Sequence, residues 1–454
     1  MDTFDLIIIG SGSGNAIPAE LSDWRIALIE KGTFGGTCLN VGCIPSKMFV
    51  LPADIAEAAR HGSRLGVDTS FNGVDWPAIR DRVFGRIDPI AAGGEEYRAT
   101  GTPNLELIRG TATFVDQRVL EVDGRRLTAP RILVATGSRA IVPDVGGLLD
   151  VRHHTSDTIM RLDRLPRRLG ILGGGFIATE MGHVFSGFGS QVTLFSRSAP
   201  LLRAEDAEVA ERFTEVFGRR VDLRLGRIPD RFETVGDAIR IHAGDEVTEV
   251  DELLVAIGRQ PNSDLIDARA GGLEVDEWGM IKVDAAMATN VEGVWAVGDV
   301  ANPHQLKHLA NAEAKVAFWN MANPGEPRTV DYRAVPHAVF SDPQVGAVGL
   351  TEQQAIDAGI DHVVGRRDYA GTAYGWALED GDSFANVLIA RDTGLIIGAH
   401  VLGPQAATLV QPLIQAMQFG RTAAELANDV FYIHPALTEV VENALLDGLE
   451  KLGS

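Results

Sequence analysis

The apolar positions near the start of the chain form an uninterrupted run over residues 6–9, which predicts a buried strand. The run leads into Gly10-Ser11-Gly12-Ser13-Gly14-Asn15 and then into a short stretch with helical spacing. A second apolar run, 24–29, ends on Glu30. This order predicts a βαβ unit whose turn amides approach a diphosphate and whose acid binds a ribose. A glycine pattern alone is weak evidence, and Asn15 departs from it, so the prediction rests on its context.

The same pattern of positions returns in the middle of the chain. An apolar run, 169–172, leads into Gly173-Gly174-Gly175-Phe176-Ile177-Ala178, and a helical pattern follows to residue 188, with a strand over 191–195. Arg197 and Arg203 come after this strand, where the first unit has an acid. Arginines there favour the 2′-phosphate of NADP over NAD. Two solvated surface arginines are the alternative interpretation.

Each unit is followed by a similar apolar strand, 132–137 after the first and 253–258 after the second. This internal repeat predicts two related nucleotide domains. A further strand, 294–297, ends in Gly298-Asp299, where the acid is either a turn residue or a ligand of a cofactor hydroxyl. From about residue 332 the pattern changes to strands over 341–350, 384–390 and 396–402 and an amphipathic helix over 409–418, which predict an α+β domain.

Composition and charge narrow the possible partners. The chain has 454 residues, of which 45% are hydrophobic and 50 are glycine, as expected for a globular α/β protein. The formal charge of -21 disfavours nucleic acid and anionic membranes, so an anionic cofactor needs local arginines and backbone donors. No apolar stretch reaches the roughly 18 residues of a membrane span, and no basic leader precedes the first strand. We therefore expect no membrane partner and a cytoplasmic location.

The only two cysteines, Cys38 and Cys43, lie five residues apart just after the first unit. A structural zinc site needs a second pair of ligands that the sequence lacks, so no metal is expected. A structural disulfide across so short a loop adds little stability. In an ideal helix the two side chains diverge too far to bond, but Gly42 and Pro45 indicate a distorted backbone. Redox chemistry is the favoured interpretation, and two incidental thiols are the alternative.

Two dinucleotide domains and a dithiol together predict an electron relay. A hydride donor needs a two-electron acceptor that passes electrons to sulfur, which predicts that one of the nucleotides is a flavin. A thiol with a pKa of about 8.5 also needs a base at neutral pH.

A candidate base stands near the end of the chain, in His434-Pro435-Ala436-Leu437-Thr438-Glu439. Pro435 suits the first position of a helix, which predicts His434 near its N-cap. There the helix dipole disfavours imidazolium, and Glu439 offsets this effect. A lone histidine is more often structural than catalytic, but the cysteine pair requires a base, which favours a catalytic role for His434. The other ten histidines show no comparable setting and are expected on the surface or in the core.

These elements together resemble the flavoprotein disulfide reductases over nearly the whole chain. The motifs that carry the resemblance are Gly35-Gly36-Thr37-Cys38-Leu39-Asn40-Val41-Gly42-Cys43 with Lys47, Ala135-Thr136-Gly137, the second glycine motif with Glu180, Gly298-Asp299, and His434-Pro435 with Glu439. The resemblance implies an α/β fold with two Rossmann-like dinucleotide-binding domains and a C-terminal α+β dimerisation domain. The expected parts are an FAD-binding domain (1–143), an NADPH-binding domain (144–262), a central domain that completes the FAD site (263–331) and an interface domain (332–454).

The resemblance also implies which residues bind the two cofactors. The residues expected at FAD are Gly10, Gly12, Ser13, Gly14, Glu30, Thr37, Lys47, Ala112, Thr136, Gly137, Arg259 and Asp299. Those expected at NADPH are Gly173, Gly175, Ile177, Arg197, Arg203 and Gly258.

The resemblance implies a division of labour among the catalytic residues. Cys43 would be the thiolate that contacts the flavin, and Cys38 the thiol that attacks the substrate. Lys47, paired with Glu180, would lie near flavin N5. His434, activated by Glu439, would come from the partner subunit of a homodimer, so that the active site is shared.

The cysteine count reduces the number of enzyme classes, and therefore of substrates, that the resemblance allows. Large thioredoxin reductases and mercuric reductases need an additional C-terminal pair, which residues 447–454 lack. Arg197 argues against a dihydrolipoamide dehydrogenase, which would favour NAD. Stretches at 83–90, 307–311, 373–380 and 433–437 are most similar to the members that reduce mycothiol disulfide. We therefore expect a small-molecule disulfide substrate. A glutathione-type reductase or a dihydrolipoamide dehydrogenase is the enzymatic alternative, and a nucleotide-bound redox sensor the non-enzymatic one.

Overall fold

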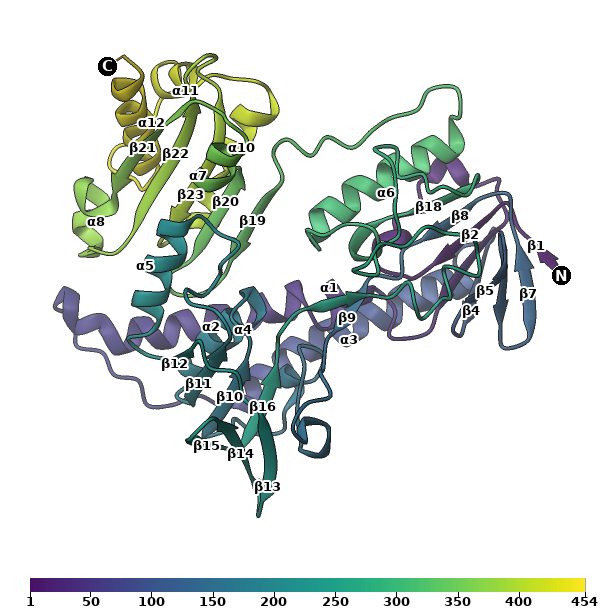
Figure 1. Cartoon of the computed structure of the whole chain (residues 1–454), viewed down its shortest axis with the longest axis horizontal. Helices are drawn as coiled ribbons and strands as arrows, with labels where there is room; N and C mark the ends of the chain where they lie inside the picture. The colour runs from purple at the N-terminus through teal and green to yellow at the C-terminus, as the bar shows by residue number, and fades with distance from the viewer. Residues whose placement is uncertain (454) are drawn as a thin grey trace. The chain divides into compact units, whose positions relative to one another are not determined.

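The computed structural model describes residues 1–453, and the chain divides into two compact units. Unit 1 comprises Met1–Ser46, Ala78–Ile141 and Gly258–Asp331, and unit 2 comprises Lys47–Pro77, Val142–Ile257 and Tyr332–Ser454. The chain passes from one unit to the other five times, twice inside the long helices α2 (Cys43–His61) and α3 (Trp76–Thr100) and three times at residues 141–142, 257–258 and 331–332. Figure 1 shows the elements with their labels.

Unit 1 is built on a five-stranded parallel sheet in the order β18-β8-β2-β3-β4. Its strands are β18 (Val294–Ala296), β8 (Ile132–Val134), β2 (Leu6–Ile9), β3 (Ile26–Glu30) and β4 (Leu105–Arg109). The side chains of β2 alternate between two apolar clusters, with Ile7 and Ile9 in one and Leu6 and Ile8 in the other. The sheet is therefore buried on both faces, which explains why its strands are continuous apolar runs.

The other elements of unit 1 surround this sheet. They are a four-stranded sheet of β1 (Asp2–Thr3), β7 (Arg125–Thr128), β6 (Val119–Val122) and β5 (Thr113–Asp116), a pair of short strands β9 (Ser138–Ala140) and β17 (Arg259–Pro261), the helices α1 (Gly36–Asn40) and α6 (Lys307–Ala322), and the 3₁₀ turns η1 (Ser13–Asn15), η2 (Ala19–Leu21) and η6 (Gly298–Val300).

Unit 2 contains a second parallel sheet, in the order β12-β11-β10-β16, and an antiparallel hairpin sheet. These comprise β12 (Asp222–Leu225), β11 (Gln191–Ser196), β10 (Arg168–Leu172), β16 (Glu252–Val255), β13 (Arg231–Val235), β14 (Ala238–Ala243) and β15 (Glu246–Val250). The accompanying helices and turns are α4 (Phe176–Gly187), α5 (Ala207–Phe217), η3 (Gly62–Leu65), η4 (Leu148–Asp150) and η5 (Ile159–Arg161).

The C-terminal part of unit 2 is an antiparallel sheet in the order β19-β20-β23-β22-β21, with α12 lying along β21 and β22 (Figure 1). Its elements are β19 (Pro336–Val339), β20 (Val345–Gly349), α7 (Glu352–Asp357), β21 (His362–Asp368), η7 (Tyr369–Gly371), α8 (Ala373–Leu378), β22 (Phe384–Ala390), β23 (Ile396–Leu402), α9 (Ala406–Leu409), α10 (Gln411–Gln418), α11 (Ala423–Asn428) and α12 (Thr438–Gly453). The helix and sheet approach so closely that a Cβ on Gly365 would lie 2.1 Å from the carbonyl oxygen of Ala444.

The two parallel sheets repeat one local design, as the sequence predicted. Gly10, after β2, has φ +103°, and a Cβ there would lie 2.4 Å from the carbonyl oxygen of Ala135. Gly173, after β10, has φ +133°, and a Cβ there would lie 2.2 Å from the carbonyl oxygen of Ala256. Only glycine fits a positive φ and so close a contact. The predicted α/β class with an α+β C-terminal domain is confirmed.

The helix predicted after the first glycine turn was wrong. The chain forms two 3₁₀ turns there, η1 and η2, and Pro18 precedes the second. Arg98 on α3 holds Asn15 by donating to its Oδ1 at 2.7 Å and to its carbonyl oxygen at 2.8 Å. The missing backbone donor of Pro18 and the side-chain contact of Asn15 explain why no α-helix propagates here.

Within residues 1–453 no helix combines the length and the apolarity that crossing a membrane requires.

Candidate functional site

The two cysteines, both in unit 1, face each other across the break between α1 and the first residue of α2. α1 ends at Asn40, Val41 leaves the helical conformation with φ −143°, and α2 begins at Cys43. A Cβ on Gly42 would lie 3.0 Å from the carbonyl oxygen of Thr37, so a larger residue would crowd this turn. The backbone distortion predicted from Gly42 and Pro45 is confirmed. It brings two free thiols together, Cys38 half-buried and Cys43 exposed.

The contact between the two thiols changes the pKa of Cys38. The hydrogen bond with Cys43 raises the pKa of Cys38, and burial raises it further, whereas the charge of Lys307 acts in the opposite direction. A close dithiol that loses one proton shares the remaining one. The contact with Cys43 and the burial thus both favour the protonated form of Cys38.

Lys307 was not predicted as a site residue, although it lies in one of the stretches used to narrow the substrate. It is the first residue of α6, and its Nζ donates to Ser13 Oγ at 3.0 Å, while Ser13 Oγ lies 3.2 Å from Asn311 Oδ1. The ammonium of Lys307 thus contacts the first glycine turn, although the two lie almost three hundred residues apart in the sequence. No local pattern in the sequence marks this pairing.

The residues expected around the first dinucleotide gather at the carboxyl ends of the parallel strands of unit 1. Glu30 Oε2 accepts from the amide and hydroxyl of Ser11 at 2.9 and 2.7 Å, which fixes the carboxylate beside the glycine turn. A Cβ on Gly14 would lie 2.9 Å from the side chains of Ile8 and Ala135. Gly12 lies against Gly36, Thr37 is exposed on α1, and Ala112 is buried after β4.

A second group of expected FAD residues meets at β9. Ser138 Oγ donates to Asp299 Oδ2 at 2.6 Å and accepts from Arg259 Nε at 2.8 Å. The side chain of Arg259 is 8% exposed, and its Nε lies 4.0 Å from Asp299 Oδ2, so the carboxylate offsets the charge of the guanidinium. The carbonyl oxygens of Thr136 and Gly137 are held by Asn262.

The same region offers polar atoms for a bound cofactor. Thr136 Oγ1 is buried without a hydrogen-bond partner among the described residues. Together with the open glycine turn and the Lys307 ammonium, it gives unit 1 a donor set that fits an anionic dinucleotide with hydroxyl groups.

Five of the six residues expected at NADPH belong to unit 2. Gly173 and Gly175 form the second glycine turn, and Ile177 is in the first turn of α4. Gly258 follows β16 in the chain with φ +144° and is the first residue of the last segment of unit 1. Arg197 and Arg203 are both exposed, and the structure gives neither an acidic partner among the described residues. Most other arginines of the chain pair with carboxylates, so these two are available to an anion.

Lys47 and Glu180 form an ion pair between α2 and α4, inside unit 2. Lys47 Nζ lies 2.7 Å from both carboxylate oxygens, and the side chain of Glu180 is 5% exposed. Glu180 Oε1 also accepts the amide of Phe340 at 3.0 Å, and the ammonium lies 4.6 Å from the Phe340 ring centre. A buried carboxylate with two donors is well satisfied, which fixes the ammonium in place.

His434 and Glu439 meet as predicted, but not through the predicted helix start. His434 Nδ1 lies 2.6 Å from Glu439 Oε1, which orients the imidazole. The prediction that Pro435 starts the helix was wrong: α12 begins at Thr438 and the His434–Pro435 peptide is cis. His434 therefore precedes the helix by four residues instead of lying at its N-cap, and it contacts the helix through Glu439 in the first turn.

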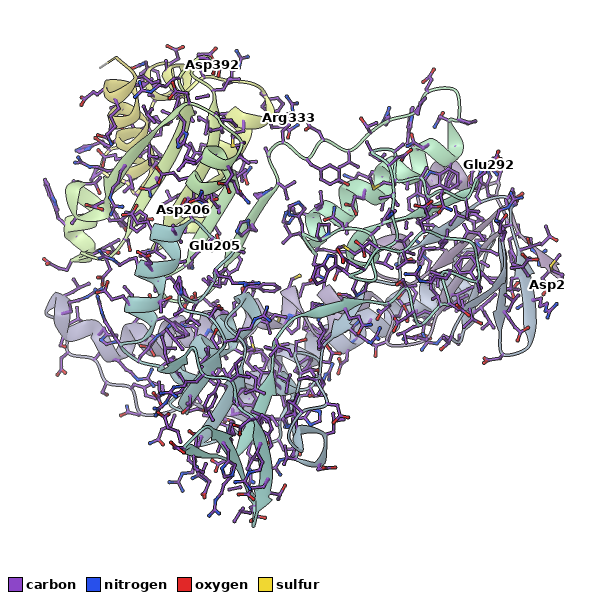
Figure 2. All side chains as sticks on the ribbon, viewed as in Figure 1. Asp2, Glu205, Asp206, Glu292, Arg333 and Asp392 are labelled. Atoms are coloured by element: carbon purple, nitrogen blue, oxygen red, sulfur yellow. The ribbon has the colours of Figure 1, made fainter. Side chains whose placement is uncertain are left out.

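The prediction that no other histidine has a comparable setting was also wrong. His337 Nε2 lies 2.8 Å from Glu205 Oε1, and this contact raises the pKa of His337 against the opposing effect of burial. Glu205 and Asp206, labelled in Figure 2, lie side by side just before α5. His154, His183 and His242 also contact carboxylates. A nearby acid thus does not by itself distinguish His434, and neither does exposure, because His61 is 65% exposed and lies 3.4 Å from Glu57. What distinguishes His434 is the combination of a 72% exposed side chain with a carboxylate contact as short as 2.6 Å.

In the part of the chain that the structure describes, no three His, Cys, Asp or Glu side chains come together as metal ligands would.

Comparisons with known proteins agree with this arrangement. Residues 4–316 match the family model of pyridine nucleotide-disulphide oxidoreductases, and residues 335–445 match the dimerisation domain of the same family. The chain is 46% identical to mycothione reductase of Mycobacterium tuberculosis, covering 98% of this chain and 99% of the relative. It is 33% identical to dihydrolipoyl dehydrogenase of Haloferax volcanii, covering 99% and 98%.

A solved structure is similar along the same length. The HOCl-induced flavoprotein disulfide reductase RclA from Escherichia coli superposes with a TM-score of 0.85 at 27% identity, covering 98% of this chain and 99% of that one.

Proposed function

Because the chain belongs to the pyridine nucleotide-disulphide oxidoreductase family, we propose that it reduces mycothiol disulfide with electrons from NADPH. It is a flavin-dependent oxidoreductase whose cofactors are FAD and NADPH. The proposed reaction is NADPH + H⁺ + RSSR → NADP⁺ + 2 RSH, where RSH is mycothiol. The observation that carries the proposal is the thiol contact of Cys38 with Cys43, in a chain 46% identical to a mycothione reductase.

Bound FAD would supply the two-electron step that reduces the Cys38–Cys43 disulfide, and the chain's own residues would do the rest. His434 would accept the proton of the Cys38 thiol, the resulting thiolate would attack one sulfur of the substrate to form a mixed disulfide, and His434 would return the proton to the leaving thiolate. The Cys43 thiolate would then attack Cys38 Sγ and restore the Cys38–Cys43 disulfide, and the second mycothiol would leave as a thiolate that takes up a proton from solution. Glu439 would keep the His434 imidazole oriented for both transfers.

The contacts support specific roles for the remaining residues. The first glycine turn, Glu30, Thr37, Ala112, Thr136, Gly137, Arg259 and Asp299 would hold FAD, with Lys47 and Glu180 beside the flavin. The second turn, Ile177, Gly258, Arg197 and Arg203 would hold NADPH. We also propose the four-part division 1–143, 144–262, 263–331 and 332–454. The dimerisation domain supports a homodimer, in which each site would use His434 of the partner subunit.

A steady-state comparison of substrates tests this proposal. Mycothiol disulfide, glutathione disulfide and lipoamide are each offered with NADPH and with NADH. We expect kcat/KM to be highest for mycothiol disulfide with NADPH. A higher kcat/KM for lipoamide with NADH, or for glutathione disulfide, would contradict the proposed substrate.

Replacing Arg197 tests the proposed cofactor preference. Because Arg197 is exposed and without an acidic partner among the described residues, Arg197→Ala should not disturb folding. A hydrogen bond to a charged group contributes about 1.5–3 kcal/mol. We therefore expect KM for NADPH to rise roughly 10- to 100-fold while KM for NADH stays unchanged. Equal KM values in variant and parent would mean that the arginine is only a solvated surface residue.

A further inference from the structure

His183 on α4 is a buried titratable residue for which the proposed reaction has no use. Its side chain is 0% exposed. Nε2 lies 2.8 Å from Asp54 Oδ1 on α2, and Nδ1 lies 2.8 Å from Arg220 Nη2, just after α5. An arginine can only donate, so Nδ1 must accept and Nε2 must carry the proton that Asp54 accepts. These contacts engage both ring nitrogens and fix the orientation of the imidazole.

Arg220 extends this network to the segment between β19 and β20. Its Nη2 also donates to the carbonyl oxygen of Asp342 at 2.8 Å, and its Nη1 lies 3.7 Å from Glu57 Oε1. Burial lowers the pKa of Arg220, and the nearby carboxylates of Asp342, Glu57 and Asp54 oppose that effect. The guanidinium thus joins α2, α4 and the segment 340–342 inside unit 2.

Glu180, one helical turn before His183 on α4, also holds the segment 340–342. It accepts the amide of Phe340, and the Phe340 ring lies beside the Lys47 ammonium that Glu180 also binds. The segment is therefore fixed at two points, its Phe340 amide by Glu180 and its Asp342 carbonyl by Arg220. Fixing both ends determines where the Phe340 ring, and with it the ammonium, can lie.

Direct chemistry is not available to His183. Both ring nitrogens are engaged and no part of the side chain reaches solvent, so it cannot take a proton from a substrate. It belongs to no group of potential metal ligands in the described residues.

We propose that His183 and Arg220 are positioning residues for the Lys47–Glu180 pair. His183 fixes Asp54 on α2 and the guanidinium of Arg220, and Arg220 fixes the segment that carries Phe340. The inference rests on the proposed function, in which Lys47 and Glu180 serve the transfer of electrons from NADPH to FAD. Loss of the network should therefore slow that half-reaction and spare the exchange between the dithiol and the substrate.

A pair of His183 variants tests the proposal. In His183→Gln the amide oxygen can accept from Arg220 and the amide nitrogen can donate to Asp54, whereas His183→Leu can do neither. Flavin reduction by NADPH is followed by rapid mixing, together with FAD content and reoxidation of the reduced enzyme by disulfide. A misplacement of about 1 Å can slow a reaction by about 100-fold. We expect flavin reduction in His183→Leu to be between about 10- and 100-fold slower and in His183→Gln to stay within about threefold of the parent.

Controls separate positioning from general damage. His242 pairs with Glu233 in the β13–β14 hairpin, so His242→Leu removes a histidine–carboxylate pair elsewhere and should leave both half-reactions unchanged. If His183→Leu does not fold, the same comparison can be made at Asp54, which is only half-buried. Asp54→Asn can still accept the hydrogen bond from His183 and Asp54→Ala cannot, so flavin reduction should be slow only in Asp54→Ala. Equal rates in Leu and Gln variants, or equal slowing of both half-reactions, would overturn the proposal. A parent enzyme that NADPH does not reduce would instead overturn the proposed function.

Discussion

Cys38→Ser should abolish disulfide reduction, with a loss in kcat of at least about 10³-fold. A serine hydroxyl at neutral pH is not ionised and cannot replace a thiolate as the nucleophile toward the substrate sulfur. The same variant should keep a long-wavelength absorbance from the Cys43 thiolate beside the flavin, because Cys43 no longer shares a proton with a second thiol. Turnover of mycothiol disulfide and the visible spectrum of the purified enzyme measure the two effects.

Cys43→Ser is the matched control, because it removes the other member of the same pair. It should also stop turnover, but without the long-wavelength absorbance, because in the proposed arrangement Cys43, and not Cys38, is the sulfur that contacts the flavin. The opposite distribution of the absorbance between the two variants would exchange the proposed roles of the cysteines. A fully active Cys38→Ser enzyme would remove the pair from the mechanism.

Buried strands were the elements that the sequence predicted best. β22 and β23 have the predicted bounds, because nearly every residue in them is buried and each run contains only one polar side chain, Asn386 in β22 and His400 in β23. The strand predicted over 341–350 is shorter, Val345–Gly349. Ser341 Oγ donates to the carbonyl oxygen of Pro343, which forms a turn before the strand. Apolar runs thus predict strand cores, and local polar contacts decide the ends.

Helix starts were predicted less well. Pro18 and Pro435 are both present in the sequence, but the first precedes a 3₁₀ turn and the second lies before a helix that begins at Thr438. Proline is compatible with a helix start and also with a turn, so its position alone does not distinguish the two. The contact of Asn15 with Arg98, from a distant helix, was one of the deciding interactions.

The candidate site combines residues that are far apart in sequence. Lys47 with Glu180 and His434 with Glu439 were predicted, the first pair because the resemblance implied it and the second because its members are close neighbours. Lys307 with Ser13 was missed, because neither residue type nor spacing predicts a contact between α6 and the first glycine turn. Physical reasoning on one sequence reaches local contacts, whereas long-range contacts need the fold.

His434→Ala should slow disulfide turnover by about 10² to 10⁴-fold, the usual contribution of a general acid or base. The loss should fall on the reaction of the reduced dithiol with mycothiol disulfide and leave flavin reduction by NADPH unchanged, because in the proposed mechanism His434 transfers protons only to and from the thiols. Glu439→Gln should have a smaller effect, since an amide oxygen can still accept from Nδ1 and keep the imidazole oriented. Rapid mixing of each half-reaction separates these outcomes, and slowing of both halves in His434→Ala would contradict the assigned role.

Mixed dimers test whether His434 serves the partner's cysteines. One subunit carries Cys38→Ser and keeps His434, and the other carries His434→Ala and keeps Cys38. If the site is shared, one of the two sites in each hybrid has both residues intact, whereas the other has neither. Random pairing of equal amounts makes half of the dimers hybrids, so about a quarter of the parent activity should return although each variant alone is nearly inactive. If Cys38 and His434 of the same subunit worked together, every site would lack one of them, and mixing would restore nothing.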